Sequence, residues 1–262
     1  MNHPIAPSAW LAEPAELTLT PGDVHVWWVD IGQLAGHEQF LRGMLSSDEL
    51  GRAARFRFED DRRRYIAVRA SLRHLLGRYL SMPPGRVPFR YGRHGKPELV
   101  AWSPEDRLRF NVSHSGNLAL CAITRRRAVG VDLERIRRLR GLEAIAERYF
   151  TGQEAATLRE MPPHRQLEAF FEGWTRKEAL VKATGYGLFQ ALDSFEVSLV
   201  AGEQVIDVQA GPGQPRCALW KIVTLSPGHG YAGALAAEGR DWRWTGYQLV
   251  KLSPPPVGSG PQ

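Results

Sequence analysis

Two acidic residues, Asp132 and Glu134, stand at the end of the apolar segment 129–131 and are separated only by Leu133. Side chains two positions apart on a strand project from the same face, so a strand here would place the two carboxylates side by side. Paired carboxylates without a histidine or thiol beside them suit a hard cation such as Mg²⁺. The competing interpretation is a solvated strand end in front of the basic run 135–138.

A second group of candidate residues lies in the segment 170–188, where Trp174, Glu178 and Lys182 recur at every fourth position. On a helix these three side chains lie one above another on one face. Glu178 would offer a third carboxylate to a metal, and Lys182 would offer a cation to a phosphate. The alternative is an ordinary surface ion pair between Glu178 and Lys182.

The turn sequence 111–116 contains Ser113 and His114. A Ser-His-Ser-Gly turn offers hydroxyls, backbone N–H groups and an imidazole to an anion. A serine hydrolase is disfavoured because neither Ser113 nor Ser115 lies in a G-x-S-x-G elbow. For His114 the alternative is a structural role.

Cations upstream of this turn could clamp a phosphate or could simply form a solvated face. Four of them fall in the stretch 47–80: Arg52, Arg55, Arg64 and Arg69. Lys96 lies on a Gly-Lys-Pro turn and is one of only five lysines among 34 cationic residues. Most cationic residues of this chain are arginines. A lysine at position 96 therefore indicates that this position needs a compact ammonium group.

The elements that must position these groups follow from periodicity and capping residues. Helical sequence runs over 47–80, with a cap at Ser46 or Ser47 and a break near 56–58. Further helices are expected at 141–149, after the capping-box pattern 151–154, and at 165–184. Strands are expected at 24–29, 87–91, 109–112, 118–123, 129–133, 194–200, 205–209, 218–225, 232–237 and 245–249.

One internal similarity indicates a duplication. Residues 114–122 resemble residues 229–237, and the order of a helix followed by strands occurs in both parts of the chain. The sequence therefore predicts an α+β fold built from two similar halves.

The composition limits the class of protein. With 262 residues, 43% hydrophobic and 24% charged, the chain is typical of a folded globular protein. Its longest apolar run, 118–123, is far short of the ~20 residues of a membrane span, and no secretory signal is visible, so a cytoplasmic protein is expected. Cys121 and Cys217 are too far apart in the sequence to indicate a zinc site or a disulfide framework. The net charge of +6 predicts an anionic partner: nucleic acid, an acidic protein or a phosphate-rich small molecule.

Four segments taken in order resemble the 4′-phosphopantetheinyl transferases, and in particular the large monomeric type: 95–97, 110–116, 129–134 and 174–188. The resemblance implies two α+β halves related by a pseudo-two-fold axis, with coenzyme A in the cleft between them. On this basis residues 1–124 form the N-terminal half, residues 125–252 the C-terminal half and residues 253–262 a flexible tail.

The resemblance also implies a role for each candidate residue. Asp132, Glu134 and Glu178 would bind Mg²⁺ together with the coenzyme A pyrophosphate. Lys182 would neutralise the pyrophosphate, and Ser113 and His114 would meet phosphate groups. Arg52, Arg64 and Lys96 would surround the 3′-phosphoadenosine. Glu178 and Lys182 are then the catalytic residues, with Glu178 or a metal-bound water as the base.

The implied reaction is attack by a serine hydroxyl of an apo acyl or peptidyl carrier protein on the β-phosphorus of coenzyme A. It yields the holo carrier and adenosine 3′,5′-bisphosphate. The arginine-rich surface suits an acidic carrier protein. Two rival hypotheses are a basic nucleic-acid-binding protein without catalytic activity and another Mg²⁺-dependent nucleotide transferase. Scattered aromatic residues and the absence of an RNA-recognition signature disfavour the first.

Overall fold

The computed structural model describes residues 10–92, 97–100, 107–185, 191–208, 218–250 and 252. The α-helices are α1 (Glu38–Arg42), α2 (Ser47–Ala53), α3 (Glu59–Leu80), α4 (Leu142–Tyr149), α5 (Gly152–Glu160) and α6 (Pro163–Thr184). Short 3₁₀ turns are η1 (Ala35–His37), η2 (Pro84–Arg86) and η4 (Leu192–Ser194). The strands are β1 (Leu11–Ala12), β2 (Asp23–Asp30), β3 (Phe89–Tyr91), β4 (Pro97–Leu99), β5 (Leu108–Ser115), β6 (Leu118–Arg125), β7 (Val129–Arg135), β8 (Glu203–Val208), β9 (Ala218–Leu225), β10 (Tyr231–Glu238) and β11 (Arg243–Leu249). Among these helices, none has the length and apolar character that a membrane span requires.

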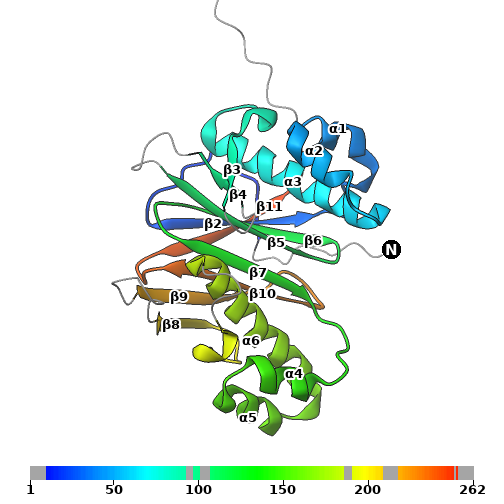
Figure 1. The fold of residues 1–262 in the computed structure, drawn as a ribbon. Helices are drawn as coiled ribbons and strands as arrows, with labels where there is room; N and C mark the ends of the chain where they lie inside the picture. The colour runs from blue at the N-terminus through cyan, green and yellow to red at the C-terminus, as the bar shows by residue number, and fades with distance from the viewer. Residues whose placement is uncertain are drawn as a thin grey trace, which may run out of the picture.

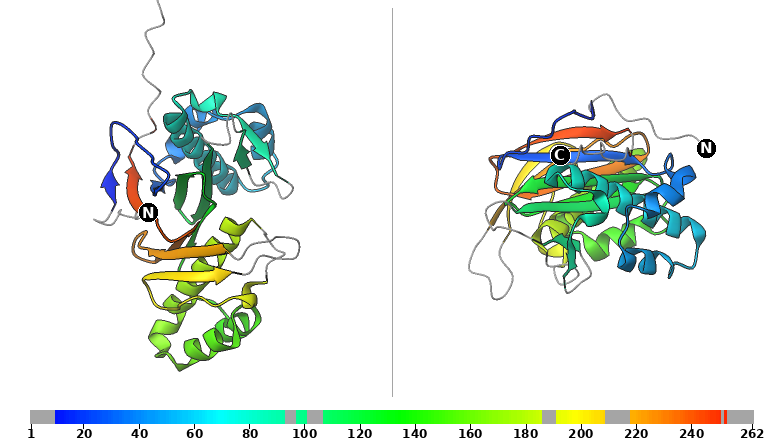
Figure 2. Two further views of the ribbon diagram at one scale, coloured as in Figure 1. Left: turned by 90° about the vertical axis from the view of Figure 1, so that its left-hand side faces the viewer. Right: turned by 90° about the horizontal axis from the view of Figure 1, so that it is seen from above.

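Two β-sheets form the centre of the molecule, and one long helix covers the outer face of each (Figures 1 and 2). The first sheet has the order β1-β11-β2-β6-β5, and the second has the order β7-β10-β9-β8. Apolar side chains of the two inner faces pack against each other, while α3 packs on the first sheet and α6 on the second. Strand β2 is buried along its whole length because both of its faces are covered.

The two halves repeat one topology. In the first, β2, α3, β5 and β6 follow each other along the chain and the strands lie in the order β2-β6-β5. In the second, β7, α6, β9 and β10 follow each other and the strands lie in the order β7-β10-β9. The similar segments 114–122 and 229–237 fall on the equivalent hairpins β5–β6 and β9–β10. The predicted α+β fold with two similar halves is confirmed.

Strand β11 connects the end of the second half to the first half. It runs parallel to β2, with Arg243 opposite Asp23 and Leu249 opposite Val29. The first sheet is therefore completed by a strand from the far end of the chain, and the boundary between residues 124 and 125 stays a prediction. The tail 253–262 and Cys217 lie outside the described residues, whereas Cys121 is buried.

Local sequence signals account for most element boundaries. Ser46 and Glu49 form a capping box at the start of α2, the helix ends before the break expected near 56–58, and α3 begins at Glu59. The strand expected at 194–200 is wrong. This segment begins at the last residue of η4 and continues as irregular chain. Two of its N–H groups bond side chains, Val197 N to Glu154 Oε1 (2.7 Å) and Ser198 N to Gln204 Oε1 (2.8 Å).

Candidate functional site

Helix α6 crosses strand β7 in backbone contact at Gly130. A Cβ atom at this position would lie 2.0 Å from the carbonyl oxygen of Ala179 and 2.5 Å from the nitrogen of Ala183, so only glycine permits the approach. Asp132 and Glu134 follow Gly130 at two-residue intervals on β7, on the face that α6 covers. The crossing therefore brings the acidic strand end and the helix face with Glu178 and Lys182 together.

Strand β5 of the first sheet lies along β7, and side chains connect the two strands. Three hydrogen bonds follow one another: Val131 N to Asn111 Oδ1 (2.9 Å), Ser113 Oγ to Asp132 Oδ1 (2.9 Å) and Ser115 Oγ to Glu134 Oε2 (3.1 Å). Sequence reasoning selected Ser113 and missed Asn111 and Ser115 as partners of β7. Their two-residue spacing could have identified them, because alternate residues of a strand share one face.

Asp132 forms the centre of the site. Its side chain is buried, and its Oδ1 atom accepts hydrogen bonds from Ser113 Oγ and from Lys182 Nζ (2.6 Å). Lys182 Nζ also lies 3.0 Å from Ser113 Oγ, so lysine, serine and aspartate form a closed triangle. The other carboxylate oxygen, Asp132 Oδ2, is buried and has no hydrogen-bond partner within the described structure.

A pocket of about 410 Å³ opens over these groups. Its walls contain six predicted site residues and two apolar neighbours: Ser113, His114, Asp132, Glu134, Glu178, Lys182, Val112 and Trp174. The structure thus brings together residues from β5, β7 and α6 that are up to 69 positions apart in the sequence. Trp174 stacks on Phe170 and stands at an angle to Tyr149, which fixes its ring at the pocket wall.

The pKa of Glu178 reflects its burial and the nearby carboxylates. Burial raises the pKa of Glu178 above its usual value, and the negative charge of Asp132 raises it further. The charge of Lys182 opposes this shift, and Glu134 adds to it. Across the ranges that the structure describes, however, no three His, Cys, Asp or Glu side chains form a preformed metal centre. In this arrangement Lys182, and not a carboxylate, is the nearest charged neighbour of Asp132 Oδ1.

His114 extends the site toward the first half. Shielding from water lowers the pKa of its imidazole, and the positive charges of Lys182 and Arg64 lower it further. Arg64 lies on α3, is partly exposed and donates a hydrogen bond to Asp61 (3.2 Å). The pocket wall therefore holds Lys182 and His114, with the charge of Arg64 close enough to affect the pKa of His114.

Arg52 lies at a second pocket, of about 630 Å³, that α2 and β3 form. Its lining residues are Asp48, Arg52, Arg55, Phe56 and Tyr91. The Arg52 guanidinium lies 5.9 Å from the ring centroid of Tyr65, the residue next to Arg64 on α3. Arg52 thus connects this pocket with α3. Lys96, the remaining predicted cation, lies outside the described residues.

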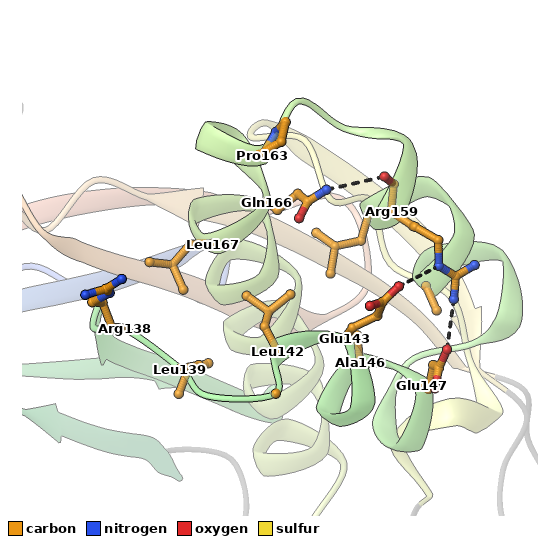
Figure 3. Close-up of a pocket in the computed structure, with 13 residues that line it drawn as sticks. Arg138, Leu139, Leu142, Glu143, Ala146, Glu147, Arg159, Pro163, Gln166 and Leu167 are labelled. Atoms are coloured by element: carbon orange, nitrogen blue, oxygen red, sulfur yellow. Dashed lines mark hydrogen bonds and ion pairs between the residues drawn. The ribbon is translucent and has the colours of Figure 1, made fainter.

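A third pocket, of about 530 Å³, lies between α4, α5 and the beginning of α6 (Figure 3). Arg138 stands at one end, and at the other Arg159 bridges Glu143 and Glu147, each at 2.9 Å. None of the predicted catalytic or cofactor-binding residues is among its lining residues. This pocket is separate from the acidic one.

Comparison with known proteins gives consistent results over both halves. A family model described as the 4′-phosphopantetheinyl transferase superfamily matches residues 128–236, and one described as the N-terminal part of 4′-phosphopantetheinyl transferases matches residues 36–126. The 4′-phosphopantetheinyl transferase HetI of Nostoc sp. strain PCC 7120 is 41% identical over 234 residues, which cover 89% of this chain and 95% of the relative. The 4′-phosphopantetheinyl transferase Sfp of Bacillus subtilis is 28% identical over 193 residues, which cover 74% of this chain and 82% of the relative.

Proposed function

Because this chain belongs to the 4′-phosphopantetheinyl transferase family, we propose that it converts apo carrier proteins to their holo forms in a Mg²⁺-dependent reaction. The enzyme transfers the 4′-phosphopantetheine group of coenzyme A to a serine of an acyl or peptidyl carrier protein. The serine oxygen forms a bond to the β-phosphorus, and the bond from that phosphorus to the bridging oxygen breaks. The leaving group is adenosine 3′,5′-bisphosphate.

The carboxylates of Asp132, Glu134 and Glu178 would hold the Mg²⁺ ion. Hard oxygen donors suit this ion, and the orphaned, buried Oδ2 atom of Asp132 is an acceptor that a cation would satisfy. The raised pKa of Glu178 supports the same assignment, since it reflects burial and nearby negative charge that a cation would offset. When bound, Mg²⁺ would supply charge stabilisation for the phosphoryl group in the transition state.

The chain's own residues supply positioning and charge. Lys182 is held between Asp132 and Ser113 and would present its ammonium group to the pyrophosphate. Ser113 would donate to a phosphate oxygen in place of Asp132 when the ligand enters. Two groups are candidates to accept the proton of the attacking serine: Glu178 and a water bound to the metal.

The remaining phosphate contacts would come from the first half. His114 lines the acidic pocket and, with Arg64 of α3 nearby, would bind a phosphate, while Arg52 in the second pocket would bind at the 3′-phosphoadenosine. Coenzyme A would then extend from β7 and α6 across the edge of α3 toward α2. Lys96 is proposed for the same end of the ligand from its sequence position.

The carrier protein would approach on the side of residues 135–140. Arg137 and Arg138 lie three and four residues after Glu134. Arg137 is exposed and pairs with Glu134 (3.4 Å), and Arg138 lines the pocket of Figure 3. By contrast, Arg125 and Arg127 are bonded to the backbone carbonyls of Leu19 and Pro21, which favours a structural role. We propose an acidic carrier, a monomeric enzyme and a cytoplasmic location.

The observation that carries this proposal is the closed triangle of Lys182, Asp132 and Ser113 beneath the pocket that Glu134 and Glu178 share. It is tested by incubating the protein with coenzyme A, Mg²⁺ and an apo carrier and measuring the mass of the carrier. The carrier should gain one phosphopantetheine group, and Asp132→Asn should abolish the gain. An unchanged carrier mass for the wild type, together with binding to nucleic acid, would favour the rival hypothesis of a basic binding protein.

A further inference from the structure

Arg69 on α3 connects the interior of the first half with the wall of the second pocket. The arginine is almost fully buried. Its Nε atom donates to Glu49 Oε1 (2.8 Å), and its Nη2 atom donates to the hydroxyl of Tyr91 (2.9 Å). The planar guanidinium lies over the ring of Phe89, 4.9 Å from its centroid. One side chain thus bonds Glu49 and Tyr91 at once, and the planar guanidinium sets the direction of both hydrogen bonds.

Tyr91 is the residue that this bond fixes. Its side chain is 39% exposed, and it lines the second pocket opposite Arg52 and Arg55. Asp48 of α2 lines the same pocket, and a hydrogen bond from Ser46 and, with smaller effect, one from Tyr91 lower the pKa of Asp48. The hydrogen bond from buried Arg69 therefore restricts rotation of the Tyr91 side chain toward solvent.

The second half of the molecule provides a comparison for Arg69. Helices α3 and α6 both have 22 residues and both end at a residue with left-handed backbone conformation, Ser81 and Gly185. Counted from the first residue of each helix, Arg73 matches Lys177, and both pair with a buried glutamate. Arg69 matches Gly173. In the second half one cation is sufficient for the glutamate, so Arg69 is an addition with its own role.

We propose that Arg69 and Tyr91 form a positioning pair that shapes the second pocket for a planar base carrying a phosphate. Arg69 acts through Tyr91, whose ring forms one wall, while Arg52 and Arg55 provide the cations. This inference rests on the proposed function, in which the phosphorylated adenosine of coenzyme A occupies this pocket. It adds a positioning role to residues that contact no reacting atom.

The experiment compares Tyr91→Phe, Arg69→Lys and Arg69→Met with the wild type, and uses Arg90→Met as the matched control. Arg90 lies on the same strand as Tyr91 and forms only an exposed pair with Glu98. Two properties are measured: the affinity for adenosine 3′,5′-bisphosphate by calorimetry, and kcat and KM for coenzyme A. Tyr91→Phe keeps the ring and the ion pair of Arg69 with Glu49 and removes only the hydroxyl, so it should fold normally.

We expect Tyr91→Phe and Arg69→Lys each to weaken bisphosphate binding and to raise KM for coenzyme A about tenfold, with kcat nearly unchanged. Arg69→Lys should recover the Tm that Arg69→Met loses, because lysine restores a charge for Glu49, but it should not recover affinity. The double variant of Arg69→Lys and Tyr91→Phe should bind no more weakly than either single variant. Arg90→Met should match the wild type.

Unchanged affinity in Tyr91→Phe, or recovery of Tm and affinity together in Arg69→Lys, would overturn the positioning role. Either result leaves carrier modification by the wild type intact. A wild type that modifies no carrier would instead overturn the proposed function, so the two failures are distinguishable.

Discussion

In the first half Glu49 completes the capping box of α2 and pairs with Arg73 of α3, and in the second half Glu154 completes the capping box of α5 and pairs with Lys177 of α6. Each cation also bonds two backbone carbonyls of the segment that follows its own helix. Arg73 donates to Pro84 O and Val87 O, and Lys177 donates to Leu192 O and Phe195 O. The same buried device therefore joins a short helix, a long helix and a loop in both halves.

The two halves differ at positions of the long helices that follow Arg73 and Lys177. Glu178 and Lys182 of α6 line the acidic pocket, whereas the matching positions of α3 hold His74 and Arg78. Burial lowers the pKa of His74 to about 4, and Arg78 is engaged by Glu13 and the carbonyl of Pro14. The two halves thus share a scaffold, whereas the residues proposed for phosphoryl transfer lie on the second long helix and most of those proposed for phosphate binding lie in the first half.

The largest effect is expected when the buried pair of a glutamate and a cation is broken in either half. Glu49→Gln and Glu154→Gln should each lower the free energy of unfolding by about 3–5 kcal/mol, because a buried cation loses its counter-charge. Urea unfolding curves of the two variants measure this. If one half tolerated its substitution, the two devices would not be equivalent.

A division of labour between the halves should appear in the kinetics. Lys182→Ala should lower kcat about 100-fold or more, because it removes charge beside the reacting phosphorus. Arg52→Ala should raise KM for coenzyme A about tenfold and leave kcat nearly unchanged, because its cation binds the distant end of the ligand. Steady-state kinetics of the two variants provide the test. A lower kcat in both variants would contradict the division of roles between the halves.

The contribution of the 3′-phosphate sharpens the same comparison. Dephospho-coenzyme A should be the poorer substrate for the wild type. Arg64→Ala or His114→Ala should each reduce the difference in KM between coenzyme A and dephospho-coenzyme A by about tenfold. Lys96→Ala is expected to do the same. Equal use of both substrates by the wild type would remove these residues from the 3′-phosphate.

The smallest effects concern the carrier. Since basic surface would steer an acidic partner, kcat/KM for the carrier should fall as the salt concentration rises, with kcat little changed. Arg137→Ala and Arg138→Ala should each lower kcat/KM a few-fold, and Arg126→Ala, in the other arginine cluster, serves as a control. Salt-independent kcat/KM would argue against electrostatic steering.

The sequence was sufficient for features that depend on neighbouring residues. The cap at Ser46, the helix break before Glu59 and the capping box at Thr151 all occur where they were predicted. Alternation on β7 and four-residue spacing on α6 correctly grouped Asp132 with Glu134 and Glu178 with Lys182. Their meeting could be inferred only through family resemblance, because the crossing at Gly130 joins elements that are distant in sequence.

Long-range contacts explain what the sequence did not predict. The segment 194–200 alternates buried and exposed side chains like a strand, yet its N–H groups bond the side chains of Glu154 and Gln204. Lys177 and Arg69 look like ordinary helix surface in the sequence, and only their distant partners Glu154 and Glu49 show that they are buried. The return of β11 to the first sheet likewise leaves no local signal.

The central claim is that Asp132, Glu134 and Glu178 act as one Mg²⁺ site. Its most direct test measures carrier modification by Asp132→Asn, Glu178→Gln and the double variant over a range of Mg²⁺ concentrations. If one ion joins the carboxylates, each single variant loses most activity, the double variant loses little more, and EDTA abolishes wild-type activity. Losses that multiply in the double variant, or full wild-type activity in EDTA, would contradict the claim.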